Sequence, residues 1–275
     1  MNGFRLIGRI GRKVVMLSFT CALAGLVFVS QASAGNMDAE ISEIKLGNFG
    51  AFVKMDSDGL TRLKLVCGKQ DITEDEDSAF REVTFNEGLA NFPAENMETV
   101  KINMYTGGAN CCQGYYLLVV ENHPEGAKHY AAYVEPYDGG LAMNSEPAGY
   151  AAIDPSFKGY ELEGTGVFLS RAESPRLSRL LVFENGKWRA DKPGEFAEYY
   201  LDMLAETDEM INPLSKAIAL SYYHVMADYP ADEAKGLLQN EMPKEFAAKP
   251  EIVDRIFADI EEAVKAFDPV ENLDI

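Results

Sequence analysis

The residues best suited to covalent chemistry are three cysteines, Cys67, Cys111 and Cys112. In an oxidising compartment we expect two of them to pair. Neighbouring Cα atoms lie about 3.8 Å apart across a trans peptide, which is below the usual disulfide range of roughly 4.4–6.8 Å. Because a bond between Cys111 and Cys112 would be strained, we predict a disulfide from Cys67 to one of them, which would stabilise the fold by about 2–4 kcal/mol. A vicinal disulfide and a free or redox-active arrangement stay open as alternatives.

The adjacent cysteines lie in a glycine-rich segment, residues 105–114, which reads Tyr-Thr-Gly-Gly-Ala-Asn-Cys-Cys-Gln-Gly. Gly107, Gly108 and Gly114 allow backbone angles closed to other residues, so we expect a tight loop with Asn110 just before the cysteines. The loop contains no Lys, Arg or His that would activate a thiol. It resembles the Gly-Gly-Ala-x-Cys-Cys turn of a loose group of uncharacterised exported bacterial proteins. This resemblance covers the loop and its flanking strands and implies no activity.

Two histidines are the candidate metal ligands. His123 and His129 flank a Pro-Glu-Gly turn, and across a short hairpin their imidazoles could approach each other and bind zinc or copper. The alternative is a pair of solvated loop residues. A second metal-like pattern, Asp-Ser-Asp-Gly at 56–59, resembles the start of a calcium loop. Its twelfth position holds Cys67 instead of glutamate, which favours a hairpin turn.

Signatures of common enzymes are missing from the sequence. It has no Gly-x-Ser-x-Gly elbow, no His-Glu-x-x-His motif and no phosphate-binding glycine loop. A carboxylate pair for glycoside cleavage could be present among the 44 acidic residues, but such a pair is defined by spatial separation. We therefore assign no catalytic residue and predict no cofactor, and whether the protein is an enzyme stays open.

Alternating and continuous apolar runs predict strands over much of residues 40–190. Two pairs of runs flank hairpin signals, Asp58-Gly59 and Asn185-Gly186. Residues 100–105 alternate apolar side chains with Lys, Asn and Tyr, which is typical of a half-buried strand, whereas 115–120 is continuously apolar and indicates a central strand. The expected strands are 49–53, 60–66, 100–105, 115–120, 129–134, 180–184 and 187–189.

From residue 196 onward the apolar spacing becomes helical. Helices are expected over 196–206, 214–227 and 231–240 and after Pro250, with prolines between them. The sequence therefore predicts an α+β protein, in which an N-terminal, mainly antiparallel β region precedes a C-terminal helical region. The expected divisions are a signal peptide at 1–34, a β-rich domain at 35–195 and a helical region at 196–275.

The first 34 residues have the three parts of a secretory signal peptide. A basic start precedes an apolar run over 14–29, and Ala32-Ser33-Ala34 forms a small-x-small cleavage site. The apolar run is shorter than the ~20 residues of a spanning helix. Cys21 lies in this run, and Phe19-Thr20 before it is a poor lipoprotein match. We expect cleavage after Ala34, a periplasmic or secreted location and no stable membrane insertion.

Cleavage would leave a strongly acidic protein. The leader removes four of the 25 basic residues, so 21 Lys and Arg would face 44 Asp and Glu, a formal charge of −23. This charge argues against nucleic acid as a ligand and favours a basic envelope or extracellular protein as a partner. We expect a non-enzymatic binding, inhibitor or immunity-type protein. The alternatives are an envelope hydrolase or redox enzyme with dispersed residues, and a metal- or small-ligand-binding module.

Overall fold

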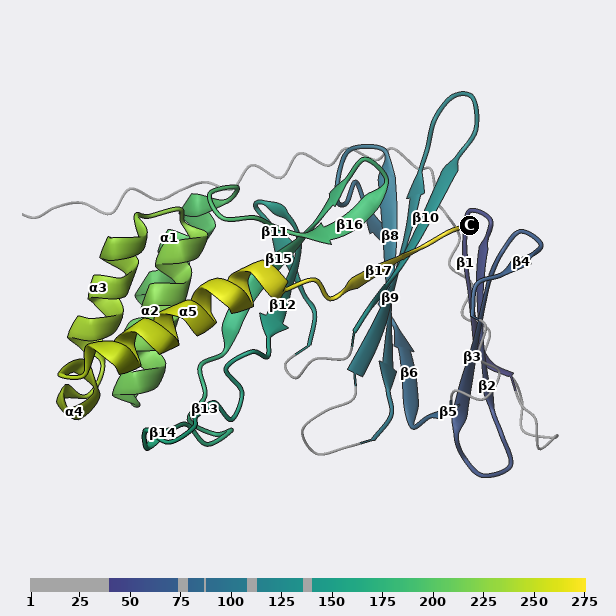
Figure 1. Ribbon diagram of the computed structural model, residues 1–275. Helices are drawn as coiled ribbons and strands as arrows, with labels where there is room; N and C mark the ends of the chain where they lie inside the picture. The colour runs from purple at the N-terminus through teal and green to yellow at the C-terminus, as the bar shows by residue number, and fades with distance from the viewer. Residues whose placement is uncertain (1–39, 74–78, 87, 108–112, 136–139) are drawn as a thin grey trace, which may run out of the picture.

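The computed structural model describes residues 40–73, 79–86, 88–107, 113–135 and 140–275. Antiparallel sheets form one side of the molecule and a group of helices forms the other (Figure 1). The chain is thus an α+β protein, and the helices of its described residues are confined to 197–266. No helix of the described part is long and apolar enough to cross a membrane.

Sheet A is built from the first strands of the chain. It contains β1 (Glu40–Leu46), β2 (Phe49–Met55), β3 (Thr61–Cys67), β4 (Gln70–Asp71) and β5 (Ala79–Phe80). The predicted hairpin at 56–59 joins β2 to β3, and Asp56 Oδ1 accepts the backbone N–H groups of Asp58 and Leu60 at 3.0 and 2.9 Å. The Asp-Gly pattern is therefore a turn in which the aspartate is used by the backbone.

Sheet B lies next to sheet A. It contains β6 (Glu82–Phe85), β7 (Leu89–Ala90), β8 (Met97–Tyr105), β9 (Gln113–Glu121), β10 (Lys128–Val134) and β17 (Val270–Leu273). β9 pairs with β8 on one side and β10 on the other, as the continuous apolar run predicts. Leu118 belongs to the core shared with sheet A, and Leu117 to the core on the opposite face. Both faces of sheet B are therefore covered by protein.

Sheet C covers the second face of sheet B. Its strands are β11 (Ala142–Ser145), β12 (Ala148–Asp154), β15 (Leu177–Glu184) and β16 (Lys187–Ala190), and a small separate hairpin is formed by β13 (Glu161–Leu162) and β14 (Val167–Phe168). The predicted turn joins β15 to β16, with φ of +52° at Asn185 and +81° at Gly186. Both central residues thus adopt the positive φ that a two-residue hairpin loop requires.

The helices follow the predicted order. They are α1 (Ala197–Glu206), the short 3-10 helix η1 (Thr207–Glu209), α2 (Pro213–Met226), α3 (Ala231–Glu241), α4 (Lys244–Ala247) and α5 (Pro250–Ala266). Asn212 caps α2, because its side chain accepts the N–H groups of Leu214 and Ser215. Pro213 and Pro250 stand in the first turns of their helices, where a missing N–H costs nothing.

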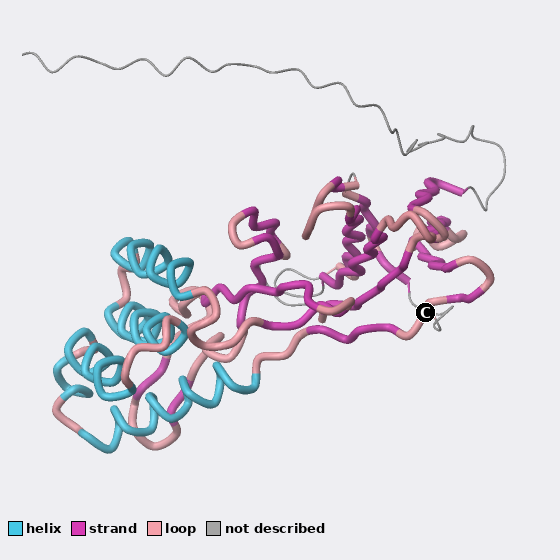
Figure 2. Tube along the Cα trace, turned by 90° about the horizontal axis from the view of Figure 1, so that it is seen from above, coloured by secondary structure: helices cyan, strands magenta, loops and turns pink. Residues whose placement is uncertain are grey.

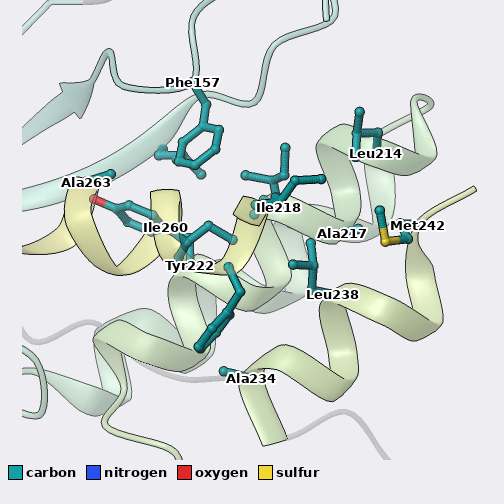
Figure 3. Close-up of a cluster of buried hydrophobic side chains, with 14 of the residues drawn as sticks. Phe157, Leu214, Ala217, Ile218, Tyr222, Ala234, Leu238, Met242, Ile260 and Ala263 are labelled. Carbon is teal, nitrogen blue, oxygen red and sulfur yellow. The ribbon is translucent and has the colours of Figure 1, made fainter. Parts of the chain in front are cut away.

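The helical layer and the residues before it share one hydrophobic core. Phe157 and Leu177, which precede the helices in the chain, belong to one buried cluster with α2 residues such as Ile218 and α5 residues such as Ile260. Figure 3 shows Phe157, Ile218 and Ile260 in this cluster. After α5 the chain returns to the sheets, and Figure 2 shows it leaving the helices and running into the strand region. There β17 pairs antiparallel with β10, a strand that the sequence pattern did not indicate.

Candidate functional site

Except for Cys67, the predicted cysteine and glycine residues belong to the β8–β9 connection and the start of β9. Cys111, Cys112, Gly108 and Asn110 lie outside the described residues. Gly107 has φ of +91°, as expected for a glycine that supports a tight loop. Gly114, by contrast, belongs to β9, where an added Cβ would lie 2.9 Å from the Tyr133 hydroxyl. Glycine there allows a close approach of side chain to backbone.

Cys67 lies at the end of β3, in sheet A. It is half-buried, and burial raises the pKa of its thiol. The structure records Cys67 as a free cysteine with respect to the residues it describes. The disulfide from Cys67 to Cys111 or Cys112 stays a prediction, since neither partner is described.

The two candidate metal-ligating histidines have different partners. His129 Nε2 accepts the backbone N–H of Asn48 at 3.0 Å, and its ring stands edge-on to Phe49. Burial lowers the pKa of His129. His123 Nε2 lies 2.9 Å from Glu121 Oε1, on the strand before the turn. Within the described ranges, no three His, Cys, Asp or Glu residues are grouped in a way that could hold a metal ion.

Sheet B carries a half-buried lysine on the face that it turns toward sheet C. Lys101 Nζ donates to Leu141 O at 2.5 Å and lies over two tyrosine rings, 5.6 Å from the Tyr115 centroid and 5.7 Å from the Tyr150 centroid. Tyr115 is in β9 and Tyr150 in β12, so the ammonium lies where the two sheets meet. It forms no ion pair with any carboxylate of the described chain. Burial lowers the pKa of Lys101.

Two buried polar atoms without partners belong to strands of the same two sheets. Four buried side-chain N or O atoms of the described residues have no hydrogen-bond partner, and two of them are Asn103 Oδ1 and Tyr150 OH. Asn103 follows Lys101 by two positions, so both lie on one face of β8. Nearby, Tyr115 OH donates to Gln113 Oε1 at 2.6 Å. The recorded contacts of the Lys101 ammonium are thus a carbonyl oxygen and two aromatic rings, without the acidic partner that usually accompanies a buried charge among the described residues.

In a second polar cluster, every nitrogen of the Arg179 guanidinium has a hydrogen-bond partner. Arg179 on β15 is 1% exposed, and its Nε donates to Asp191 Oδ1 at 3.0 Å. Its remaining donors reach Asp191 O at 2.7 Å, Tyr222 OH at 3.2 Å and Val264 O at 3.1 Å. Burial alone would lower the pKa of Arg179, but the Tyr222 hydroxyl and the Asp191 carboxylate outweigh it and raise that pKa. Tyr200 OH also donates to Asp191.

This Arg179 cluster connects the helices to sheet C. Tyr200 is in α1, Tyr222 in α2 and Val264 in α5, whereas Arg179 and Asp191 belong to or directly follow strands of sheet C. Because the groups are buried and hydrogen-bonded to one another, they position elements and offer no open coordination for a ligand. We regard the cluster as structural.

The outer side of α1 and η1 is acidic and carries exposed apolar side chains. We define the α1–η1 face by six exposed residues, which are Glu198, Leu201, Asp202, Glu206, Glu209 and Ile211. Asp208 of η1 is also exposed, but it is left out because it pairs with Lys216 Nζ at 2.9 Å. The first three acids are spaced by four residues, so they form one stripe along the helix. None of the four acids forms an ion pair with a described residue. Leu201 is 40% exposed and Ile211 is 97% exposed.

Sequence reasoning did not single out Lys101, Tyr150 or the α1–η1 face. The alternation over 100–105 indicated that one side of that strand would be polar, which was the available signal for Lys101. The structure shows that sheet C covers this side. No protein-family model matches the chain, and no curated protein or solved structure matches it.

Proposed function

We propose that the protein is an exported, non-enzymatic binding protein that docks a basic envelope or extracellular protein on its α1–η1 face. The observation that carries the proposal is the combination, within α1, η1 and the residues that follow them, of acids without ion pairs and exposed aliphatic side chains. Acidic side chains attract a cationic partner and orient it during encounter. Exposed apolar groups supply the area that is removed from water on binding.

The charge of this face belongs to a wider acidic region. Residues 193–215 contain six acids and no Lys or Arg, and residues 196–275 contain 18 acids against six Lys and Arg. The last 80 residues therefore carry a formal charge of −12. Acidic residues also keep exported proteins soluble, so charge alone does not define a binding surface. Among the described helices, α1 alone carries an exposed large hydrophobic side chain, Leu201, and this distinguishes it from the other acidic helices.

Ile211 is the strongest single indication of a partner. It is the most exposed of the large hydrophobic side chains in the described chain, and it directly precedes the Asn212 cap of α2. A fully exposed isoleucine gains about 1.5–3 kcal/mol when a partner buries it. Removing it should therefore weaken docking by about 10- to 100-fold.

The experiment is affinity capture from an envelope extract of the exporting bacterium, with matched variants of the mature protein. The face variant is E198Q/D202N/E206Q. The control is E251Q/E261Q/E262Q, which removes three exposed acids from α5 and changes the net charge by the same amount. A third variant, I211S, tests the apolar contribution.

We expect a basic protein that elutes from wild type with salt, that the α5 control retains, and that the face variant and I211S lose. Equal loss from the face variant and the α5 control would show that only net charge matters, which would overturn the proposed face. Recovery of no basic protein at moderate salt would contradict the binding function itself.

A further inference from the structure

We propose that two copies of the protein pair through β1, edge to edge and antiparallel, to form a symmetric dimer. The two β1 strands would meet about a twofold axis at Ile44, so that sheet A of one copy continues into sheet A of the other. Sheet A lies on the side of the molecule away from the helices (Figure 1). This interface is therefore separate from the α1–η1 face.

Sheet A has one long open edge. β1 stands at the end of the strand order and pairs only with β2 among the described strands. The outer side of such a strand carries backbone N–H and C=O groups with which a further strand can pair. β1 has seven residues, whereas the other edge strands of sheets A, B and C, which are β4, β5, β6, β7, β11, β16 and β17, have two to four. Short length protects an edge against pairing, and β1 lacks that protection.

The order of charges along β1 is self-complementary. β1 pairs regularly with β2 from Ser42 to Leu46, because the register shift lies before Ser42. Ile44 is the middle residue of this stretch, with Glu43 before it and Lys45 after it. Two strands related by a twofold axis at Ile44 place Glu43 of each copy opposite Lys45 of the other. Opposite charges at facing positions stabilise an antiparallel pair, whereas like charges destabilise it.

The neighbouring registers lack this complementarity. An axis at Glu43 would place two carboxylates opposite each other, and an axis at Lys45 would do the same with two ammonium groups. With the axis at Ile44, the charged side chains meet on the outer face, while Ile44 and Leu46 stay in the core that sheet A shares with sheet B. Within one copy, Lys45 Nζ lies 2.9 Å from Glu43 Oε1, so the two pairs of the dimer form one network.

The charge of sheet A also permits two copies to approach. A chain with a formal charge of −19 repels its own copies over most of its surface. Residues 40–72, which contain β1 to β4, carry five acidic and five basic residues and therefore have no net charge. The negative charge thus belongs to the rest of the chain, and β1 can pair without bringing an acidic segment against itself.

The test measures self-association of the mature protein by sedimentation velocity. Pairing of one short strand buries little area, so concentrations run from about 0.01 to 1 mM. E43K and K45E each place like charges at both facing positions. The double variant E43K/K45E exchanges the charges and restores the opposite pairs. K54E is the matched control, since Lys54 is exposed on β2 and loses the same charge as in K45E.

We expect a wild-type dimer whose fraction rises with concentration. E43K and K45E should each weaken the dimer about tenfold or more, because two attractive pairs become repulsive. The double variant and K54E should dimerise like wild type. The register is tested by oxidising an equal mixture of E43C and K45C, followed by peptide mass spectrometry. Facing Cα atoms lie about 4.5–5.5 Å apart, within disulfide range, so positions 43 and 45 of different copies should link.

Three results would overturn the proposal. One is a wild-type protein that stays monomeric throughout the concentration range. Another is a double variant that dimerises no better than E43K or K45E, which would exclude the facing charge pairs. The third is E43C alone forming linked dimers as readily as the mixture, which would exclude the axis at Ile44. Partner capture by the α1–η1 face is unaffected by any of these results, so the two proposals fail separately.

Discussion

Replacing Arg179 with methionine should destabilise the protein severely. The substitution keeps an apolar stem of similar length but removes the charge and the donors that reach Asp191, Tyr222 and Val264. The Asp191 carboxylate, whose side chain is 0% exposed, would then be buried without its counter-charge. Removing one partner of a buried pair costs about 3–5 kcal/mol. That is a large fraction of the roughly 5–15 kcal/mol by which domains are stable.

The assay is urea unfolding followed by tryptophan fluorescence. The sequence contains one tryptophan, Trp188, and it is 1% exposed on β16, three residues before Asp191. Its emission therefore reports directly on sheet C. With an m-value of about 1–3 kcal/mol/M, we expect the R179M midpoint to fall by at least 1 M.

The double variant R179M/D191L separates pairing from packing. Because it removes both charges, its loss of unfolding free energy should be several kcal/mol smaller than the sum of the two single losses. K235M breaks the exposed pair of Lys235 with Asp254 and should cost about 0–1 kcal/mol. The interpretation would be refuted if R179M lost less than 1 kcal/mol, or if the losses of the two single variants added in the double variant.

Three further predictions concern stability. Burial lowers the pKa of His129, whose neutral Nε2 accepts the Asn48 N–H. The stability from this group is therefore complete above the unfolded pKa of about 6.5 and is lost as pH falls. Between pH 7.5 and 5.5, wild type should lose more unfolding free energy in urea than H129Q, and equal losses would contradict this. Gly186 has φ of +81°, and a Cβ would lie 2.5 Å from Tyr130 Cε1, so G186A should cost about 1–3 kcal/mol. G236A, in open space on α3, should instead stabilise by about 0.4–1 kcal/mol, and calorimetry comparing both variants with wild type would expose an error in either sign.

The elements that the sequence predicts well are those with local signals. The turn at Asn185-Gly186 requires positive φ at both residues, and Asn and Gly are the residue types that adopt positive φ most readily. The helix at 250–266 repeats its apolar residues with helical period. Its buried side can therefore be predicted from the sequence without knowing which elements pack against it. The continuous apolar run of β9 likewise indicates a strand covered on both faces.

The elements and contacts that could not be predicted depend on pairing between residues far apart in the chain. β17 consists of Val-Glu-Asn-Leu, which is too short for a period to be recognised, and its partner β10 lies more than 130 positions earlier. Its place depends on contacts such as the Asn272 side chain, which accepts from Trp188 N at 2.9 Å and donates to Trp188 O at 2.8 Å. The buried Arg179–Asp191 pair could not be predicted from the sequence either, since both residue types are ordinarily exposed.

The burial of Lys101 could not be predicted for the same reason, because a distant part of the chain covers it. A strand with alternating polar residues normally turns its polar side to water, and that was the interpretation of 100–105. The second layer, sheet C, comes from residues 142–190, whose approach to this face cannot be inferred from the strand itself. Lys101 was therefore an ordinary surface lysine in the sequence, and its half-buried position follows only from the packing of Tyr150 and sheet C beside it.

The strong negative charge of the chain should make docking on the α1–η1 face sensitive to salt. A basic partner is attracted by the acidic surface over about 10 Å at 0.1 M salt, so added salt should weaken docking on this face. Raising sodium chloride from 0.05 to about 0.3 M should therefore lower partner affinity severalfold. Titration of the partner across this range measures the effect, and an affinity that does not change with salt would contradict docking driven by charge.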